Sequence, residues 1–140
     1  MEFKFKNRRP AVGEVKIQDE FWSPYLDSIR TVMLPYVFDK FDEIGYPINF
    51  ELVAEGKKEG HRGPAFADGL LLESIRGACD FLNIAYDADL DARIDRLAAS
   101  IKAASDAIED GYFNTEIVMK RPLFRFAYHT YRFTKKYGGH

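Results

Sequence analysis

The single cysteine of this 140-residue chain, Cys79, is the side chain best suited to nucleophilic or metal-ligand chemistry. It follows Ala78 on the apolar side of a predicted helix, where a free cysteine is usually a small buried hydrophobic residue. We therefore predict a structural role for Cys79 and assign no catalytic residue to the chain. One cysteine also excludes an intrachain disulfide and a zinc finger built from cysteine pairs.

The three histidines, His61, His129 and His140, are scattered and show neither HExxH nor His-x-His spacing. We therefore expect no metal site built from this chain alone. The dinucleotide pattern G-x-G-x-x-G and the P-loop pattern are missing, and no G-x-S-x-G elbow marks a serine nucleophile. The sequence therefore lacks the motifs of dinucleotide-binding enzymes, P-loop nucleotidases and serine hydrolases of the G-x-S-x-G type.

Asp68 has two interpretations, which the sequence leaves open. It opens a predicted helix, so its carboxylate fits the N-cap position and accepts hydrogen bonds from free backbone N–H groups. Alternatively it is a polar group at the mouth of a binding pocket. We carry Asp68 forward as a candidate substrate-binding residue.

Basic and aromatic residues alternate over residues 117–137, while residues 117–140 contain no Asp or Glu. Such a segment can bind an anion or a nucleic acid through phosphate contacts and base stacking. The alternative is that its aromatic side chains complete the core. We favour the core role and expect no nucleic-acid partner, because the rest of the chain is acidic.

The length and composition predict a single domain, residues 1–140. Its 46% hydrophobic residues are enough for a folded core and exclude wholesale disorder. No apolar run approaches the roughly 20 residues that cross a bilayer. The basic start, MEFKFKNRRP, has no apolar leader sequence after it. We expect a cytoplasmic protein with no membrane partner.

An arm and a short strand are predicted within residues 1–23, with the strand at Val12–Ile17, and a helical part over residues 24–140. Ser23 fits the N-cap of the first helix and Pro24 its first position. Pro35 should kink or split this helix, and Gly45 should end it. One face of the helix is formed by apolar residues at three- and four-residue steps, Leu26, Ile29, Met33, Val37, Phe41 and Ile44.

Residues 45–67 read as irregular, because four glycines and two prolines interrupt them. A helical hairpin is predicted over residues 68–108. Asp87 is the expected N-cap of its second helix, and Asp110-Gly111 the expected end. After residue 116 the pattern leaves helix and extended loop open.

Several strings, in order and at matching spacing across residues 12–115, resemble the N-terminal part of glycoside hydrolase family 127, the β-L-arabinofuranosidase-like proteins. They are VKIQDEFWSP at 15–24, Arg30 with Leu34-Pro35, Asn49-Phe50 followed by Gly56 and Gly63, FADG at 66–69 with ESIRGA at 73–78, and DGYFNT at 110–115.

The resemblance implies a bacterial enzyme of plant-glycan breakdown that removes L-arabinofuranose with retention. It implies a cysteine nucleophile held near zinc by a glutamate and further cysteines, and a glutamate acid/base, all beyond residue 140. Zinc is thus expected in a full-length protein, and no cofactor in this chain. His140 is similar to the substrate-contacting histidine that begins the family motif H-[ED]-x-Y. Leu70 departs from the acidic residue of many members and leaves the sugar open.

The predicted fold is mainly α, with the short strand before the helices, and the resemblance implies that the helical hairpins belong to an incomplete (α/α)6 barrel. Six hairpins of the length of 68–108 need about 246 residues, so this chain cannot close the barrel. We expect a truncated hydrolase, inactive alone, with a carbohydrate as the substrate of a longer chain. The exposed apolar helix faces need a partner. The alternative is therefore a small helical interaction module, which forms a homo-oligomer through these faces.

Overall fold

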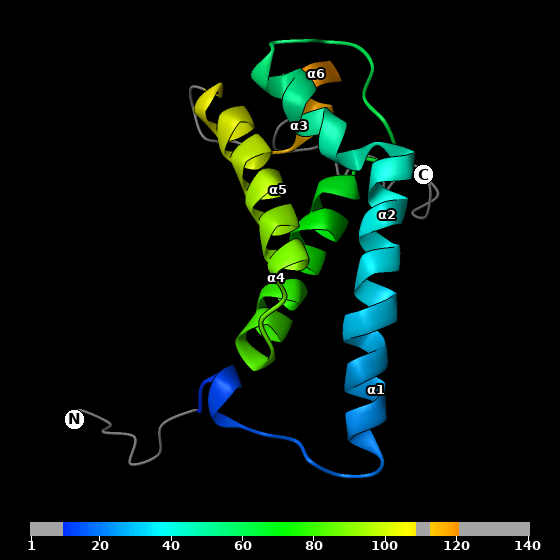
Figure 1. Cartoon of the computed structure of the whole chain (residues 1–140). Coiled ribbons are helices and arrows are strands. Elements are labelled where there is room, and N and C mark those ends of the chain that lie inside the picture. Colours follow the sequence, from blue (N-terminus) through cyan, green and yellow to red (C-terminus); the bar gives the residue numbers. More distant parts are fainter. Residues whose placement is uncertain (1–9, 109–112, 121–140) are drawn as a thin grey trace, which may run out of the picture.

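The structure is a computed structural model that describes residues 10–108 and 113–120. Every regular element in these ranges is a helix, so the mainly helical fold class is confirmed. The long helix α1–η2–α2 follows one side of the molecule, the antiparallel hairpin α4–α5 lies beside it, and α3 and α6 lie at one end (Figure 1). The elements are η1 (Val12–Glu14), α1 (Trp22–Ser28), η2 (Ile29–Met33), α2 (Leu34–Ile44), α3 (Tyr46–Ala54), α4 (Ala67–Ile84), α5 (Ala88–Asp106) and α6 (Thr115–Lys120).

The strand expected at Val12–Ile17 is not formed. Val12–Glu14 is a turn of 3-10 helix, and the backbone N–H of Ala11 donates to the Glu14 carboxylate at 2.8 Å. A strand needs a neighbouring strand for its backbone hydrogen bonds, and the described residues contain no other strand. Val15 and Ile17, which carried the weak alternation, stay about half exposed.

The N-terminus of α1 is capped by Asp19, so the prediction of Ser23 as the N-cap is wrong. The Asp19 carboxylate accepts hydrogen bonds from the backbone N–H groups of Phe21 and Trp22. Ser23 bonds back to the capping residue, because its hydroxyl oxygen accepts a hydrogen bond from the Asp19 N–H at 3.1 Å. Asp19 precedes the first turn and therefore reaches its free N–H groups, which Ser23, inside the helix, cannot do.

The interruption predicted at Pro35 is confirmed, and it takes the form of a π-helical turn at Ile29–Met33. The helix continues on both sides of this turn (Figure 1). In a regular α-helix the ring of Pro35 would clash with the carbonyl of Thr31, four residues earlier. The wider turn lies directly before the proline and accommodates it.

This extra residue per turn changes which side chains reach the core. Met33, predicted for the buried face, is 49% exposed, whereas Leu34 and Phe38 are buried. The core-facing series steps from Ile29 to Leu34, a spacing of five residues, which is the spacing of one π-helical turn. The predicted stripe is therefore wrong at Met33, and it is also wrong at Ile44, the last residue of α2, which is 45% exposed.

The segment 45–67, expected to be irregular, contains the helix α3. Gly45 ends α2 as predicted, with a left-handed φ of 87°, and α3 begins at the next residue. Pro47 lies in the first turn of α3, where the missing N–H has no helical acceptor. Only residues 55–66 form a loop, so proline and glycine marked helix boundaries here and not a continuous loop.

The core lies where α2, α3, α4 and α5 meet. Phe38, Phe50 and Leu71 are almost fully buried, and the Phe50 ring stacks on Phe113 at a centroid distance of 5.5 Å. The predicted hairpin is confirmed over α4 and α5, with Asp87 as the cap of α5 through bonds from the N–H groups of Asp89 and Leu90. Its second helix ends at Asp106, before the expected end at Asp110-Gly111, which lies outside the described residues. No helix in the described ranges is both long and apolar enough to cross a membrane.

Two glycine substitutions should change stability in opposite directions. Gly45→Ala should lower the free energy of unfolding by about 1–2 kcal/mol, because φ is 87° and the new Cβ would lie 2.5 Å from Cδ of Arg62. Gly77→Ala, inside α4 with no atom within 4 Å of its Cβ position, should raise it by about 1 kcal/mol. Urea unfolding measures both. A Gly45→Ala protein as stable as the parent would contradict the left-handed junction.

Candidate functional site

Polar side chains from two stretches of the sequence, residues 49–68 and 114–115, meet where α4 and α6 begin. We call this cluster the polar junction. Its members come from α3, from the loop 55–66, from α4 and from the start of α6; they are Asn49, His61, Asp68, Asn114 and Thr115. Asn49, Asp68 and Thr115 are all buried, so their polar groups need partners inside the protein.

The centre of the polar junction is the pair Asp68 and Thr115. One carboxylate oxygen of Asp68 accepts a hydrogen bond from the backbone N–H of Thr115 at 2.7 Å, and the other accepts from its hydroxyl at 2.8 Å. Asp68 does not cap its own helix, whose N-cap is Phe66. That interpretation of Asp68 is therefore wrong: its carboxylate holds the first residue of α6 instead.

His61 extends this pair toward the loop 55–66. The Thr115 hydroxyl donates its hydrogen to Asp68, so Nε2 of His61, at 3.0 Å from the hydroxyl oxygen, is the donor to it. Nδ1 of His61 is buried without a hydrogen-bond partner. Burial lowers the pKa of His61, and the positive charge of Lys120 lowers it further. The ring is therefore neutral at pH 7, with its proton on Nε2.

Two asparagines attach the loop 55–66 to the helices. The Asn49 side chain donates to the carbonyl of Arg62 and accepts from its N–H, both at 2.8 Å. The Asn114 side chain donates to the Ala65 carbonyl at 3.1 Å. Its oxygen accepts from the N–H of Ile117, so Asn114 caps α6. These bonds hold both the middle and the end of the loop, so the junction is rigid where the loop enters α4.

Gly63 shows how closely the loop approaches α3. Its φ is 79°, and a Cβ at this position would lie 2.4 Å from the ring of Tyr46. Only glycine fits such a contact in this left-handed conformation. The strings Asn49-Phe50, Gly63, Asp68 and Asn114-Thr115, which carry the family resemblance, thus converge on one place in the fold.

The sequence did not reveal that Thr115 is the partner of Asp68, or that His61 bonds to Thr115 in turn. A usable local signal was present for the start of α6, because Asn114 and Thr115 precede an apolar run, as N-cap residues often do. No local signal connects that pair to Asp68, which lies 47 positions earlier. The chemistry of the cluster is that of a clamp: a buried carboxylate, a hydroxyl and an imidazole hold each other in one arrangement.

Two further histidines and the basic-aromatic segment are also candidates from the sequence. His140 and His129 lie outside the described residues, as do residues 121–137 of the basic-aromatic segment. Its start, residues 117–120, belongs to α6, where Ile117 and Met119 are buried. This start contributes to the core, but the aromatic side chains on which the core prediction rests lie outside the described residues.

Cys79 is half-buried in α4 and packs against the core, in agreement with the structural role predicted for it. Zinc, which the resemblance implies for a full-length protein, does not fit the donors present here. No group of three or more His, Cys, Asp or Glu side chains in the described part of the chain is placed to hold a metal ion. We therefore derive no chemical step through zinc from these residues.

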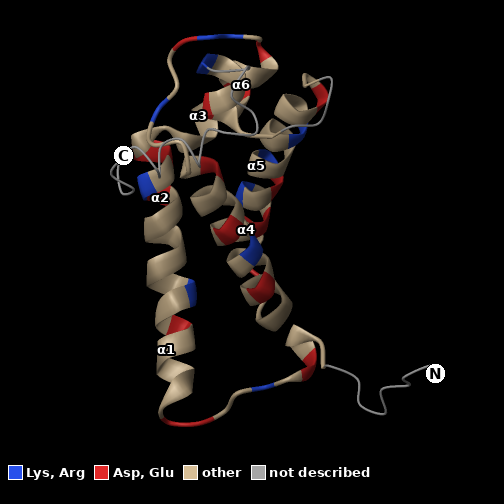
Figure 2. Cartoon of the chain, turned by 180° about the vertical axis from the view of Figure 1, so that it is seen from behind, with Lys and Arg blue, Asp and Glu red and all other residues tan. Residues whose placement is uncertain are grey.

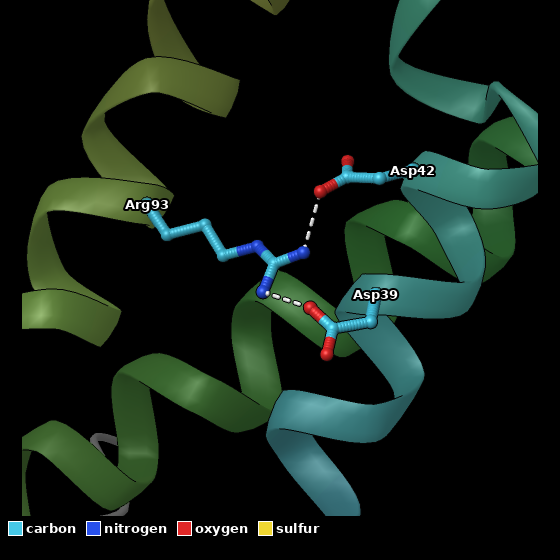
Figure 3. Close-up of polar contacts among 3 residues, drawn as sticks. All are labelled: Asp39, Asp42 and Arg93. Atoms are coloured by element: carbon cyan, nitrogen blue, oxygen red, sulfur yellow. Dashed lines mark hydrogen bonds and ion pairs between the residues drawn. The ribbon is translucent and has the colours of Figure 1, made fainter.

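A hollow of about 290 Å³ lies between α2 and the start of α5. On its wall, the Arg93 guanidinium donates to Asp39 at 2.8 Å and to Asp42 at 2.5 Å (Figure 3). The guanidinium also lies 5.5 Å from the centre of the Phe38 ring. Arg93 thus connects α5 to α2, and its hydrogen-bonding groups are directed to these two carboxylates. We assign no substrate to this hollow.

Asp68→Asn should destabilise the protein by about 2 kcal/mol. The amide offers one acceptor oxygen where the carboxylate offered two, so one buried donor of Thr115 loses its partner. Asp95→Asn, at an exposed position of α5, is the matched control and should change the free energy of unfolding by less than about 0.5 kcal/mol. Urea unfolding of both variants is the measurement. Equal stability of the two variants would show that the clamp does not hold α6.

His61 should make stability depend on pH. Its pKa in the folded protein lies below the ordinary 6.5, so the unfolded chain takes up the proton first as the pH falls. The contribution of His61 to the free energy of unfolding is therefore highest above about pH 6.5, where His61 is neutral in both states, and it decreases as the pH falls below that value. His61→Gln keeps an N–H donor for Thr115 but does not titrate, so its melting temperature should fall less between about pH 7.5 and 5. Parallel curves for the two proteins would refute this.

Comparison with known proteins gives the family. Residues 14–137 match the β-L-arabinofuranosidase GH127 catalytic domain. The fold is similar to a solved GH127 β-arabinofuranosidase, BT3674, with a TM-score of 0.70 and 30% sequence identity. The match covers 79% of this chain and 17% of that chain, so this chain spans about a sixth of that protein. No relative was found among curated proteins.

The family match extends over most of the chain, and it includes the strings that converge on the polar junction. The resemblance seen in the sequence is thereby confirmed by an independent comparison of folds. This chain belongs to the β-L-arabinofuranosidase-like glycoside hydrolase family GH127 and resembles its N-terminal segment.

Proposed function

We propose that this chain is the N-terminal segment of a glycoside hydrolase that removes L-arabinofuranose from plant-type glycans. The observation that carries the proposal is the match of residues 14–137 to the GH127 catalytic domain. It is supported by the solved relative of similar fold, which is described as a β-arabinofuranosidase. In this proposal the substrate is a carbohydrate.

We further propose that the chain is inactive by itself. The chemistry implied by the resemblance needs a cysteine nucleophile, further cysteines and a glutamate around zinc. The sequence has one cysteine, and that residue lies in α4 and packs against the hydrophobic core. One thiol cannot supply both the nucleophile and the additional ligands. The segment would therefore contribute shape and substrate contacts, and the reacting groups would come from other residues of a longer protein.

Asp68 and His140 enter the proposal as substrate-binding residues. Both oxygens of the Asp68 carboxylate already accept bonds from Thr115, so Asp68 would act at the base of a site and orient its neighbours. His61 and Thr115 would share that positioning role. The identity of the sugar, the cytoplasmic location and the bacterial source stay predictions.

The coding sequence after the codon for His140 tests the proposal. It should continue in frame and encode the glutamates and clustered cysteines that the resemblance implies. A stop codon directly after His140 would contradict the proposal of a longer enzyme.

The 140-residue chain alone should release no arabinose from an aryl β-L-arabinofuranoside above the buffer rate. The Cys79→Ser variant should behave identically, because Cys79 has a packing role. The complete protein should release it. Release by the short chain that is lost in Cys79→Ser would overturn the inactivity and the structural role of Cys79 together.

A further inference from the structure

One part of the long helix α1–η2–α2 and the residue before it carry large apolar side chains that no described residue covers. We call these residues the apolar face; each of them is between 49% and 64% exposed, and they are Phe21, Trp22, Tyr25, Val32, Met33 and Tyr36. Single exposed apolar residues are common on protein surfaces, but six along one helix form a patch of the kind that marks an interaction site.

The π-helical turn explains how this helix becomes apolar on two sides. The side chains of Ile29, Leu34 and Phe38 pack into the core, with the five-residue step across the turn. Val32 and Met33, inside the same turn, are left outside the core. A helix that is apolar on two sides is typical of one buried between two layers, and residues 10–108 and 113–120 supply only one layer.

Few charges accompany the apolar face, and those of the surrounding helix already have partners. Arg30 pairs with Asp27, Lys40 with Glu43, and Asp39 with Arg93. In Figure 2 the ribbon of α1 and of the adjoining half of α2 is mostly tan, the colour of residues other than Lys, Arg, Asp and Glu. A charged partner such as a nucleic acid would find little to pair with, so the face selects an apolar partner.

The rings at the N-terminal end of the face pack against each other. Phe21 meets Trp22 edge-on with centroids 5.0 Å apart, and it lies 5.4 Å from Tyr25 at a tilt. Aromatic side chains that pack edge-on in this way, and that keep more than half of their surface exposed, suit packing against side chains of another helix.

The size of the patch also fits a protein partner. A full aromatic side chain presents roughly 150–250 Å², so the six half-exposed residues leave on the order of 600 Å² open. That area is close to the roughly 800 Å² that each partner contributes to a standard interface. It is also at the upper end of what monomeric proteins leave exposed.

We propose that the apolar face docks against the remainder of a GH127 catalytic domain, outside the residues matched here, through an apolar helix surface of that remainder. This inference rests on the proposed function. The solved relative is matched over 17% of its chain, so most of such a protein is available to form the second layer. A segment of the same polypeptide covers the face without the loss of freedom that a separate partner would bring.

Thiol labelling at the apolar face tests this inference. Val32→Cys and, as a control in the exposed loop, Lys57→Cys are made in the Cys79→Ser background, both in the 140-residue chain and in the complete protein encoded by the continuing reading frame. Labelling is read for each peptide by mass spectrometry. We expect Val32→Cys to react at least about tenfold more slowly in the complete protein than in the short chain, and Lys57→Cys to react equally in both.

A second measurement uses the charge variant Val32→Asp. In the 140-residue chain its midpoint of urea unfolding should stay unchanged, because the position is 64% exposed. In the complete protein the midpoint should fall, since the carboxylate would be buried without a partner. Leu70→Asp, which adds the same charge to an exposed residue of α4, is the matched control in the short chain.

The outcomes separate the possible partners of the face. Equal labelling of Val32→Cys in both proteins overturns the proposal. Protection in the short chain that grows with its concentration also overturns it, and identifies a second copy of the chain as the partner. A reading frame that ends at His140 overturns this inference and the proposed function together. Protection in a complete protein that releases no arabinose supports the docking and contradicts the proposed function alone.

Discussion

The rest of the structure depends on the two hydrogen bonds that the carboxylate of Asp68 accepts from Thr115. This carboxylate is buried, and a buried carboxylate without donors would be costly. Both of its oxygens are therefore directed to Thr115, whose N–H opens α6 and whose hydroxyl also accepts from His61. The pair connects α4, α6 and the loop between α3 and α4. Four of the strings that carry the family resemblance therefore meet there, and they encode a fixed junction between helices and a loop.

The π-helical turn is the second constraint, and it decides how the chain uses its longest helix. In a regular α-helix the ring of Pro35 would clash with the backbone carbonyl of Thr31. The wider turn removes that clash, brings Leu34 and Phe38 into the core, and leaves Val32 and Met33 outside it. One local adjustment therefore produces both the packed side of this helix and the uncovered apolar side. Arg93 then connects α2 to α5 through Asp39 and Asp42.

The family and the chemistry of the chain must be kept apart. The match to the GH127 catalytic domain runs over residues 14–137, but the described residues hold no cluster of metal ligands, and the one cysteine packs against the core. The side chains that the structure brings together position loops and helix ends. In a multi-residue active site such positioning is a contribution of its own, since reacting groups must be held in one geometry.

The sequence by itself determined the features that depend on neighbours a few residues away. The hairpin of α4 and α5, the Asp87 cap and the left-handed end of α2 at Gly45 follow from periodicity and local hydrogen bonding. The π-helical turn before Pro35 is also a local feature, but periodicity alone does not show it, so the expectation that Met33 faces the core is wrong. Only the tertiary structure decided what depends on distant residues, such as the partner of Asp68, which lies 47 positions away. The strand at 12–17 failed for the same reason, because a strand exists only with a second strand beside it.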